Sequence, residues 1–420
     1  MVFAVGISGC NDPVDTGIEV PVEFKQVYDR LDATLDTLHS TIDRQWDGLP
    51  YKDFIPMASV LPANSNTGEA LLQKDYLDFV NLYVERLREM GCRGVQLDIQ
   101  FPILDPAYFA FAKAAGLLAQ DSPDDRDYLE FYKALAAAIK GAGLKLSIES
   151  QVVFTQETWS PLPVEQYYHS FDAEAAQGFE KYKQRKRAQL QRIAAELSPD
   201  YLTIGNEPET EMWLTGIKLL QTQDNYVQMT RESVDAVLMV APAGMQVGSG
   251  FGIWSDSWNY WAEKLNELPV DFINIHIYAI DIFPADPEDN VFQRACAAAD
   301  MAHGAGKHIC LGETWLYKQS PGDADDPEVI YGRDYFDFWQ PLDRKYLSLM
   351  LKIAHYKQFE FISPFWSTFF FSYLTYAEAK DLSTADRKTK NNRQAAANIY
   401  KNIYSETGTA YRDMIKNGPE

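Results

Sequence analysis

Hydrophobic and polar positions along the chain follow two alternating patterns: short apolar segments of strand length and longer amphipathic segments with helical spacing. Eight apolar segments occur, and an amphipathic segment follows each one. This alternation predicts parallel strands joined by crossover helices, and eight such units predict an α/β fold of the (β/α)8 TIM-barrel type. The expected strands are 54–60, 94–101, 144–153, 201–206, 246–250, 272–278, 308–311 and 359–366; the expected helices lie near 74–90, 125–141, 174–197, 225–240, 257–267, 291–304, 344–357 and 390–415.

An open, doubly wound parallel sheet is the alternative fold. Such a sheet commonly carries a glycine-rich phosphate-binding loop after its first strand. Residues 63–68, after the first expected strand, read Ala-Asn-Ser-Asn-Thr-Gly and do not have that pattern. The barrel is therefore the fold that we expect.

The same pattern divides the chain into three parts. Apolar residues recur at helical spacing over 24–46, before the strand-helix repeat begins, and predict a short N-terminal helical extension. We expect a tail at 1–23, a leading helix at 24–50 and a catalytic barrel at 51–420. A barrel of this length is within the known range of roughly 200 to over 400 residues.

Loop lengths differ between the two ends of the expected barrel. The turns that enter strands are short, as at 90–93, 141–143, 197–200 and 304–307, whereas those that leave strands are long, notably 154–173, 279–290, 315–343 and 367–389. Barrel enzymes build their sites from the loops after the strands. A functional site is therefore expected at that end.

Charge and motif content narrow the function. The net charge of −22 argues against nucleic-acid partners, which require a basic face, and no apolar segment is long enough to span a bilayer. Only six histidines occur, the first expected strand lacks the His-x-His of metal-dependent barrel hydrolases, and no Gly-x-Ser-x-Gly elbow joins a strand to a helix. We expect no metal and no cofactor.

The N-terminus has two interpretations. Ile7-Ser8-Gly9-Cys10 resembles a bacterial lipobox, which implies a lipid anchor at Cys10 and an extracytoplasmic lipoprotein. No basic segment precedes it and the apolar run is short, so the alternative is a disordered end on a cytoplasmic protein. Cys92, Cys296 and Cys310 lack CxxC spacing and are expected to be buried, small hydrophobic residues.

Two carboxylates end short apolar strands. Strand alternation over 201–207 places Thr203, Gly205 and Glu207 on the inward face, with Glu207 at the mouth. The seventh expected strand ends in the same manner, with Gly312 and Glu313. An acid at the carboxyl end of a barrel strand is costly to bury unless it is paired or used.

The sixth and eighth strands supply neighbours for these acids. The three isoleucines of strand six alternate, so that Asn274, His276 and Tyr278 share the inward face. A hydrogen bond from His276 or Tyr278 would keep Glu313 ionised. Strand eight ends in Trp366, which brings an indole to the same mouth.

Together, Asn206-Glu207-Pro208 after strand four, His276-x-Tyr278 on strand six, Glu313 after strand seven and Trp366 after strand eight resemble clan A of the retaining (β/α)8 glycoside hydrolases. The resemblance covers roughly residues 51–405 and leaves the family within the clan open.

It implies roles for single residues: Glu207 as the general acid/base, Asn206 as a ligand of the sugar 2-hydroxyl, Glu313 as the nucleophile and Tyr278 as its support. Many members carry an Arg at the inner end of strand two and a His on strand three. Arg93 only precedes strand two here, and strand three carries Glu149 without a His.

Other residues at this end are candidates for sugar contacts. Six of the nine Trp fall in or at the start of loops after strands, and Trp315 and Trp366 are the expected sugar contacts, because indoles stack on sugar faces. Asp98, Glu149 and Asp281 either bind sugar hydroxyls or pair structurally.

Two functions remain open from the sequence. One is a retaining glycosidase that cleaves a β-linked oligo- or polysaccharide by double displacement, which needs two carboxyls about 5–5.5 Å apart. The other is a non-catalytic carbohydrate-binding protein on a degenerate barrel. The sugar, the linkage, endo or exo action and the oligomeric state are not determined by the sequence.

Overall fold

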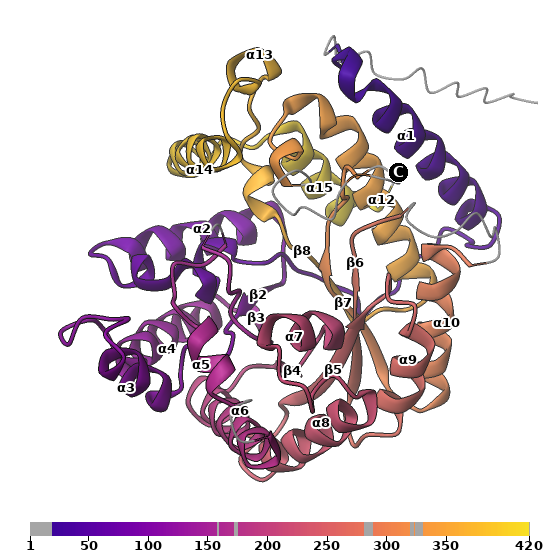
Figure 1. The fold of residues 1–420 in the computed structure, drawn as a ribbon. Helices are drawn as coiled ribbons and strands as arrows, with labels where there is room; N and C mark the ends of the chain where they lie inside the picture. The colour runs from indigo at the N-terminus through magenta and orange to yellow at the C-terminus, as the bar shows by residue number, and fades with distance from the viewer. Residues whose placement is uncertain are drawn as a thin grey trace, which may run out of the picture.

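The computed structural model describes residues 19–157, 159–171, 175–280, 289–319, 323 and 331–419. Eight parallel strands form one sheet in the order β1-β8-β7-β6-β5-β4-β3-β2, and a parallel bridge between Ser59 and Gln96 joins its two edges, so that the sheet curls into a nearly closed barrel (Figure 1). The predicted (β/α)8 fold is confirmed. The strands are β1 (Ile55–Pro56), β2 (Gly94–Asp98), β3 (Lys145–Ser150), β4 (Tyr201–Ile204), β5 (Gln246–Gly252), β6 (Phe272–Ile277), β7 (His308–Thr314) and β8 (Phe361–Pro364).

Helices surround the barrel where the amphipathic pattern expected them (Figure 1). The segment expected as one helix near 390–415 is two, because the chain turns at Asn402 with a positive φ of 55°. The α-helices are α1 (Val22–Asp43), α2 (Tyr76–Met90), α3 (Pro106–Ala114), α4 (Asp125–Gly141), α5 (Glu165–Ser170), α6 (Ala175–Leu197), α7 (Pro208–Thr215), α8 (Gln223–Leu238), α9 (Trp258–Asn266), α10 (Val291–Gly304), α12 (Gln340–Tyr356), α13 (Tyr376–Ala379), α14 (Thr384–Lys401) and α15 (Glu406–Asn417); the 3₁₀ helices are η1 (Leu61–Ala63), η2 (Ser65–Leu72), η3 (Asp337–Trp339) and η4 (Ser367–Phe370).

The barrel interior changes from apolar to polar along its axis. The lower layer is an apolar cluster of Met57, Tyr201, Phe272, Cys310 and Phe361. Above it, toward the carboxyl ends of the strands, buried polar side chains point inward from several strands, namely Asp98, Glu149, Thr203, Asn274 and His276. Several of these buried groups hydrogen-bond to one another, as at Asn274–Glu149 and Asn274–Thr203.

Glycines on β5 make room for the large inward residues of β6. Gly248 pairs with Phe272 and Gly250 pairs with Asn274 in the parallel register. A Cβ at Gly248 would lie 2.3 Å from the Phe272 ring, and one at Gly250 would lie 2.1 Å from the Asn274 carbonyl oxygen. The glycines of β5 therefore leave room for Phe272 and Asn274 of β6 inside the barrel.

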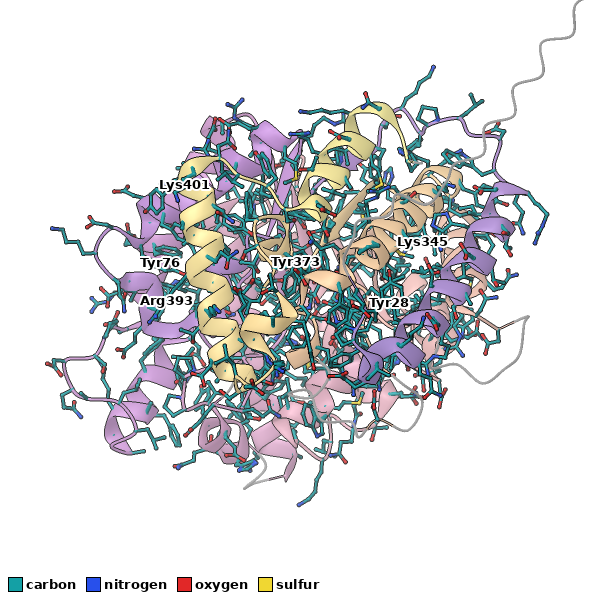
Figure 2. All side chains as sticks on the ribbon, turned by 90° about the horizontal axis from the view of Figure 1, so that it is seen from above. Tyr28, Tyr76, Lys345, Tyr373, Arg393 and Lys401 are labelled. Carbon is teal, nitrogen blue, oxygen red and sulfur yellow. The ribbon has the colours of Figure 1, made fainter. Side chains whose placement is uncertain are left out.

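The helix α1 lies outside the ring and packs against α12 (Figures 1 and 2). Its apolar stripe is buried, and Tyr28 stacks on Trp339 with ring centroids 5.7 Å apart. Lys345 of α12 pairs with Asp32 at 2.6 Å, and Lys352 pairs with Asp43 at 2.8 Å. The expected leading helix is thus present, as a brace on the outer surface of the barrel.

The two ends of the barrel differ as expected. Three-residue turns at 91–93, 142–144, 198–200 and 305–307 lead into strands, whereas the segments that leave β3, β6, β7 and β8 are long. No helix in the part of the chain that the structure describes is both long and apolar enough to cross a membrane. Cys92, Cys296 and Cys310 are buried and free, as predicted, whereas Cys10 and Asp281 lie outside the described residues.

Candidate active site

A cleft of about 940 Å³ opens at the carboxyl ends of the strands. Glu207 and Glu313 both line it, together with Tyr278 and Trp366. Its wall on the far side is formed by η1, η2 and α14, and α14 lies beside α2, as the labels Arg393 and Tyr76 show in Figure 2. The cleft therefore crosses the barrel mouth from the end of β4 to the C-terminal helices.

Glu207 is held where strand β4 turns into helix α7. Gly205 adopts a positive φ of 68°, which redirects the chain, and Pro208 then begins the helix at its first position, where its missing N–H is not needed. Gln151 Nε2 donates to the backbone oxygen of Glu207 at 3.1 Å. The carboxylate is thereby fixed at the mouth by the local turn.

Glu313 occupies the matching place on β7. The pairing of β7 with β8 shifts register between Leu311 and Thr314, and this irregularity surrounds Glu313. Tyr278 Oη donates to Glu313 Oε2 at 2.5 Å, and Tyr317 stacks on Tyr278 with centroids 4.6 Å apart. The expected support of Glu313 by strand six therefore comes from Tyr278, and Tyr317 is an addition that sequence reasoning missed.

His276 joins the two acids. The fully buried ring places Nδ1 2.8 Å from Glu207 Oε1 and 3.4 Å from Glu313 Oε2. Because one nitrogen atom is common to both distances, the two oxygens are no farther apart than the distances combined, about 6.2 Å. The sequence-predicted carboxylates thus meet at a single buried imidazole.

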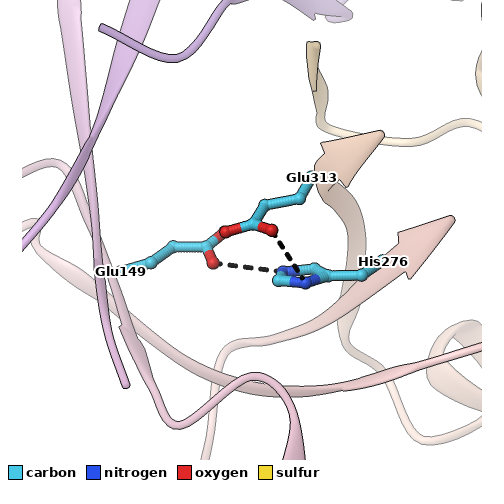
Figure 3. A group of neighbouring side chains, drawn as sticks. All are labelled: Glu149, His276 and Glu313. Atoms are coloured by element: carbon cyan, nitrogen blue, oxygen red, sulfur yellow. Dashed lines mark hydrogen bonds and ion pairs between the residues drawn. The ribbon is translucent and has the colours of Figure 1, made fainter. Parts of the chain in front are cut away.

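Glu149 on β3 approaches the other side of the same ring, as Figure 3 shows together with Glu313. His276 Nε2 lies 3.1 Å from Glu149 Oε2, and Asn274 Nδ2 donates to Glu149 Oε1 at 2.7 Å. Asn206 Nδ2 donates to Glu149 as well. The structural pairing considered for Glu149 is what the structure shows, and inward alternation on β3 was the sequence signal for it.

Crowding of charge shifts the pKa values of these groups. Burial alone would lower the pKa of His276, but the charges of Glu313 and Glu149 outweigh burial. Hydrogen bonds to Glu149 and Glu207 act in the same direction, so the pKa of His276 is well above its ordinary value. The imidazole is therefore a buried cation at neutral pH.

The carboxylates shift in opposite directions. Burial raises the pKa of Glu313 well above the ordinary range, and the neighbouring charges of Glu149 and Asp98 add to this against the charge of His276. The expectation that a hydrogen bond from His276 or Tyr278 keeps Glu313 ionised is therefore wrong for the free site, because burial outweighs both partners. Burial also acts to raise the pKa of Glu207, but the hydrogen bond and charge of His276 outweigh it and lower that pKa. Burial, together with the nearby charge of Glu149, raises the pKa of Asp98 to about 7.

Glu149, His276 and Glu313 offer ligand atoms within 4.8 Å of one another, a spacing that a metal ion requires. A metal needs a neutral imidazole with a lone pair on the ligating nitrogen. Here both ring nitrogens face carboxylate oxygens at hydrogen-bond distance, which favours the protonated ring. These donors are satisfied as an ion network and do not fit a metal.

Two of the residues predicted to bind sugar, Trp315 and Asn206, lie elsewhere than expected, and His276, which is also a candidate for substrate binding, lies on the inward face as predicted but does not line the cleft. Trp315 is 1% exposed and packs against Phe369, with ring centroids 5.7 Å apart, so its prediction as a sugar contact is wrong. Asn206 and His276 are buried beneath the cleft, because they point into the polar layer of the barrel. Trp366 lines the cleft as predicted, and its binding role stays a prediction.

Comparisons with known proteins bear on the fold. No protein-family model and no curated protein matches the sequence. The exo-β-1,4-mannosidase Op5Man5 from Opitutaceae bacterium strain TAV5 has a TM-score of 0.54 and 14% identity over 87% of this chain and 60% of its own. The family 1 β-glucosidase from Thermotoga maritima has a TM-score of 0.51 and 10% identity over 89% of this chain and 100% of its own. This chain therefore shares the barrel fold of glycoside hydrolases.

Proposed function

We propose that the protein is a retaining glycoside hydrolase of clan A that acts on a β-linked oligo- or polysaccharide. The observation that carries the proposal is the pair of carboxylates at the ends of β4 and β7. Both face the cleft, and both contact one imidazole nitrogen, at 2.8 and 3.4 Å. The two oxygens are at most about 6.2 Å apart. Inverting glycosidases have carboxyl groups roughly 6.5–9.5 Å apart and retaining ones roughly 5–5.5 Å apart, so this separation favours retention.

In this mechanism Glu313 attacks the anomeric carbon as a carboxylate and Glu207 protonates the leaving oxygen. Because the pKa of Glu313 is raised and that of Glu207 is lowered in the free site, these roles require the proton of the coupled groups to lie on the Glu207–His276 side when substrate is bound. The resulting glycosyl ester consumes the charge of Glu313, and Glu207 then removes a proton from the water that cleaves the ester. The lowered pKa of Glu207 means that the first proton is shared with His276 across their 2.8 Å contact. We assign the acid function to this hydrogen-bonded pair, with Glu207 facing the substrate.

The test is stereochemical and mutational. Proton NMR of the product first formed from a β-linked substrate should show the β-anomer, and an α-anomer as first product would rule out double displacement. The substitution Glu313→Gln should reduce kcat by about 10³-fold or more, because attack on the anomeric carbon is lost. Glu360→Gln, away from the cleft, is the control and should leave kcat unchanged.

A non-catalytic carbohydrate-binding protein is the second candidate. One observation favours it: Asp98 and Glu149 stand on strands where many clan members carry Arg and His. If no β-linked polysaccharide or aryl glycoside is turned over while oligosaccharides bind, this candidate replaces the first.

The location of the protein is a separate proposal. The lipobox-like segment supports a lipid anchor at Cys10 and an extracytoplasmic site, where polysaccharide substrates occur. Loss of labelled palmitate incorporation in Cys10→Ala would support it.

A further inference from the structure

Two indoles line the cleft beyond the carboxylate pair. Trp213 on α7 is 62% exposed, an unusual exposure for the largest apolar side chain, and Trp254 follows β5 and is half-buried. Both line the same cleft as Glu207 and Glu313. Both belong to the six Trp that the sequence places after strands, although Trp315 and Trp366 are the expected sugar contacts.

The backbone of β5 leaves room for the Trp254 ring at Gly252. A Cβ on Gly252 would lie 2.3 Å from the Trp254 ring, so a glycine is required beneath it. The Trp254 ring also lies beside Tyr278, with ring centroids 5.8 Å apart. Trp254 therefore extends the aromatic floor that begins at the support of Glu313.

The two segments that carry the indoles are tied together. Glu209, on α7, accepts hydrogen bonds from Ser255 Oγ and, at 2.6 Å, from Trp261 Nε1. Arg294 Nη1 donates to the backbone oxygens of Ile253 and Ser255 at 3.2 and 3.1 Å. These bonds hold α7 and the segment after β5 together before any ligand binds, which lowers the cost of binding.

The position of Trp213 relative to Glu207 indicates which side of the cleft the two indoles occupy. Helix α7 begins directly after Glu207, and six residues at 1.5 Å each put Trp213 about 9 Å farther along its axis. A proton donor faces the leaving oxygen, so the cleft next to the helix of the donor receives the leaving group. The C-terminal helix α14 lines the other end of the same cleft.

We propose that Trp213 and Trp254 form a leaving-group subsite that stacks a sugar ring, so the substrate is an oligo- or polysaccharide and not a glycoside of a small alcohol. This inference rests on the proposed function. Stacking on an exposed indole favours pyranose faces, which are apolar and flat, without requiring a charge.

The experiment compares two leaving groups on one sugar. Substrates are cellotetraose, mannotetraose and laminaritetraose, each with the β-glycosyl fluoride of its sugar unit, since fluoride leaves that subsite empty. Trp213→Ala should lower kcat/KM about tenfold for the tetrasaccharide that the wild type cleaves and less than twofold for the fluoride. Trp213→Phe should restore most of the loss.

Tyr400→Ala is the control, because Tyr400 is 64% exposed and does not line the cleft. Equal losses on both leaving groups, or no loss on either, would overturn the subsite. If the wild type turns over none of these substrates and no other β-linked polysaccharide or aryl glycoside, the proposed function fails on its own. Calorimetry with the same tetrasaccharides then decides: weaker binding by Trp213→Ala supports a sugar site there, and unchanged binding overturns it.

Discussion

At the scale of single residues, the site is an arrangement of buried charges around one imidazole. His276 contacts Glu149 through Nε2 and Glu207 and Glu313 through Nδ1. A buried cation among several acids lowers the cost of ionising them, and no other cation is in hydrogen-bond contact with these three acids in the described residues. Glu149 does not line the cleft, so it acts on the chemistry through its contacts with His276 and Asn206 and through its charge, which raises the pKa of Glu313.

Glu149→Gln tests this positioning role through the pH profile. The charge of Glu149 raises the pKa values of both His276 and Glu313. Removing that charge lowers both, so the acidic and basic limbs of kcat/KM should both move to lower pH, by on the order of one unit. A reduced rate with an unmoved profile would assign Glu149 a purely structural role.

At the scale of elements, the short helix α7 begins directly after Glu207 and is anchored by buried hydrogen bonds. Glu211 is fully buried and accepts hydrogen bonds from Tyr182 at 2.6 Å, from Tyr226 at 3.1 Å and from Lys186. Lys186 comes from α6 and Tyr226 from α8. An eight-residue helix has little stability of its own, so these bonds hold it in place.

Lys186→Met should therefore cost about 3–5 kcal/mol in the free energy of unfolding, because it leaves a buried carboxylate without its cation. Urea unfolding measures the loss, and the double variant Lys186→Met/Glu211→Gln should recover part of it. Lys25→Met, which breaks the exposed pair with Asp29, should cost less than about 0.5 kcal/mol. Similar losses in the two single variants would contradict the anchoring of α7.

At the scale of the whole molecule, acidic charge prevails. The chain has 60 Asp and Glu against 38 Lys and Arg. Self-repulsion of a net charge of −22 destabilises the compact state, and salt screens it over a Debye length of about 10 Å at 0.1 M. The many exposed ion pairs oppose this trend only weakly, because each contributes little.

Raising NaCl from about 0.02 to about 0.3 M should accordingly raise Tm by on the order of 2–5 °C. Differential scanning calorimetry measures the shift, and KCl at the same concentrations should give the same result. A fall in Tm would show that specific ion pairs outweigh net repulsion.

The sequence alone determined the barrel, because the period of hydrophobic positions reports local geometry: all eight strands and the brace helix lie where alternation placed them. The sequence also predicted that Glu207, Glu313 and Tyr278 lie together at the mouth of the barrel, since residues at strand ends converge in a closed parallel sheet.

What only the tertiary structure decided is contact between distant strands. The meeting of His276 with Glu149, the burial of Trp315 and the position of Trp213 and Trp254 on one cleft depend on side-chain directions and register shifts across the barrel. Local sequence carries no record of these, because each is set by packing between segments far apart in the chain.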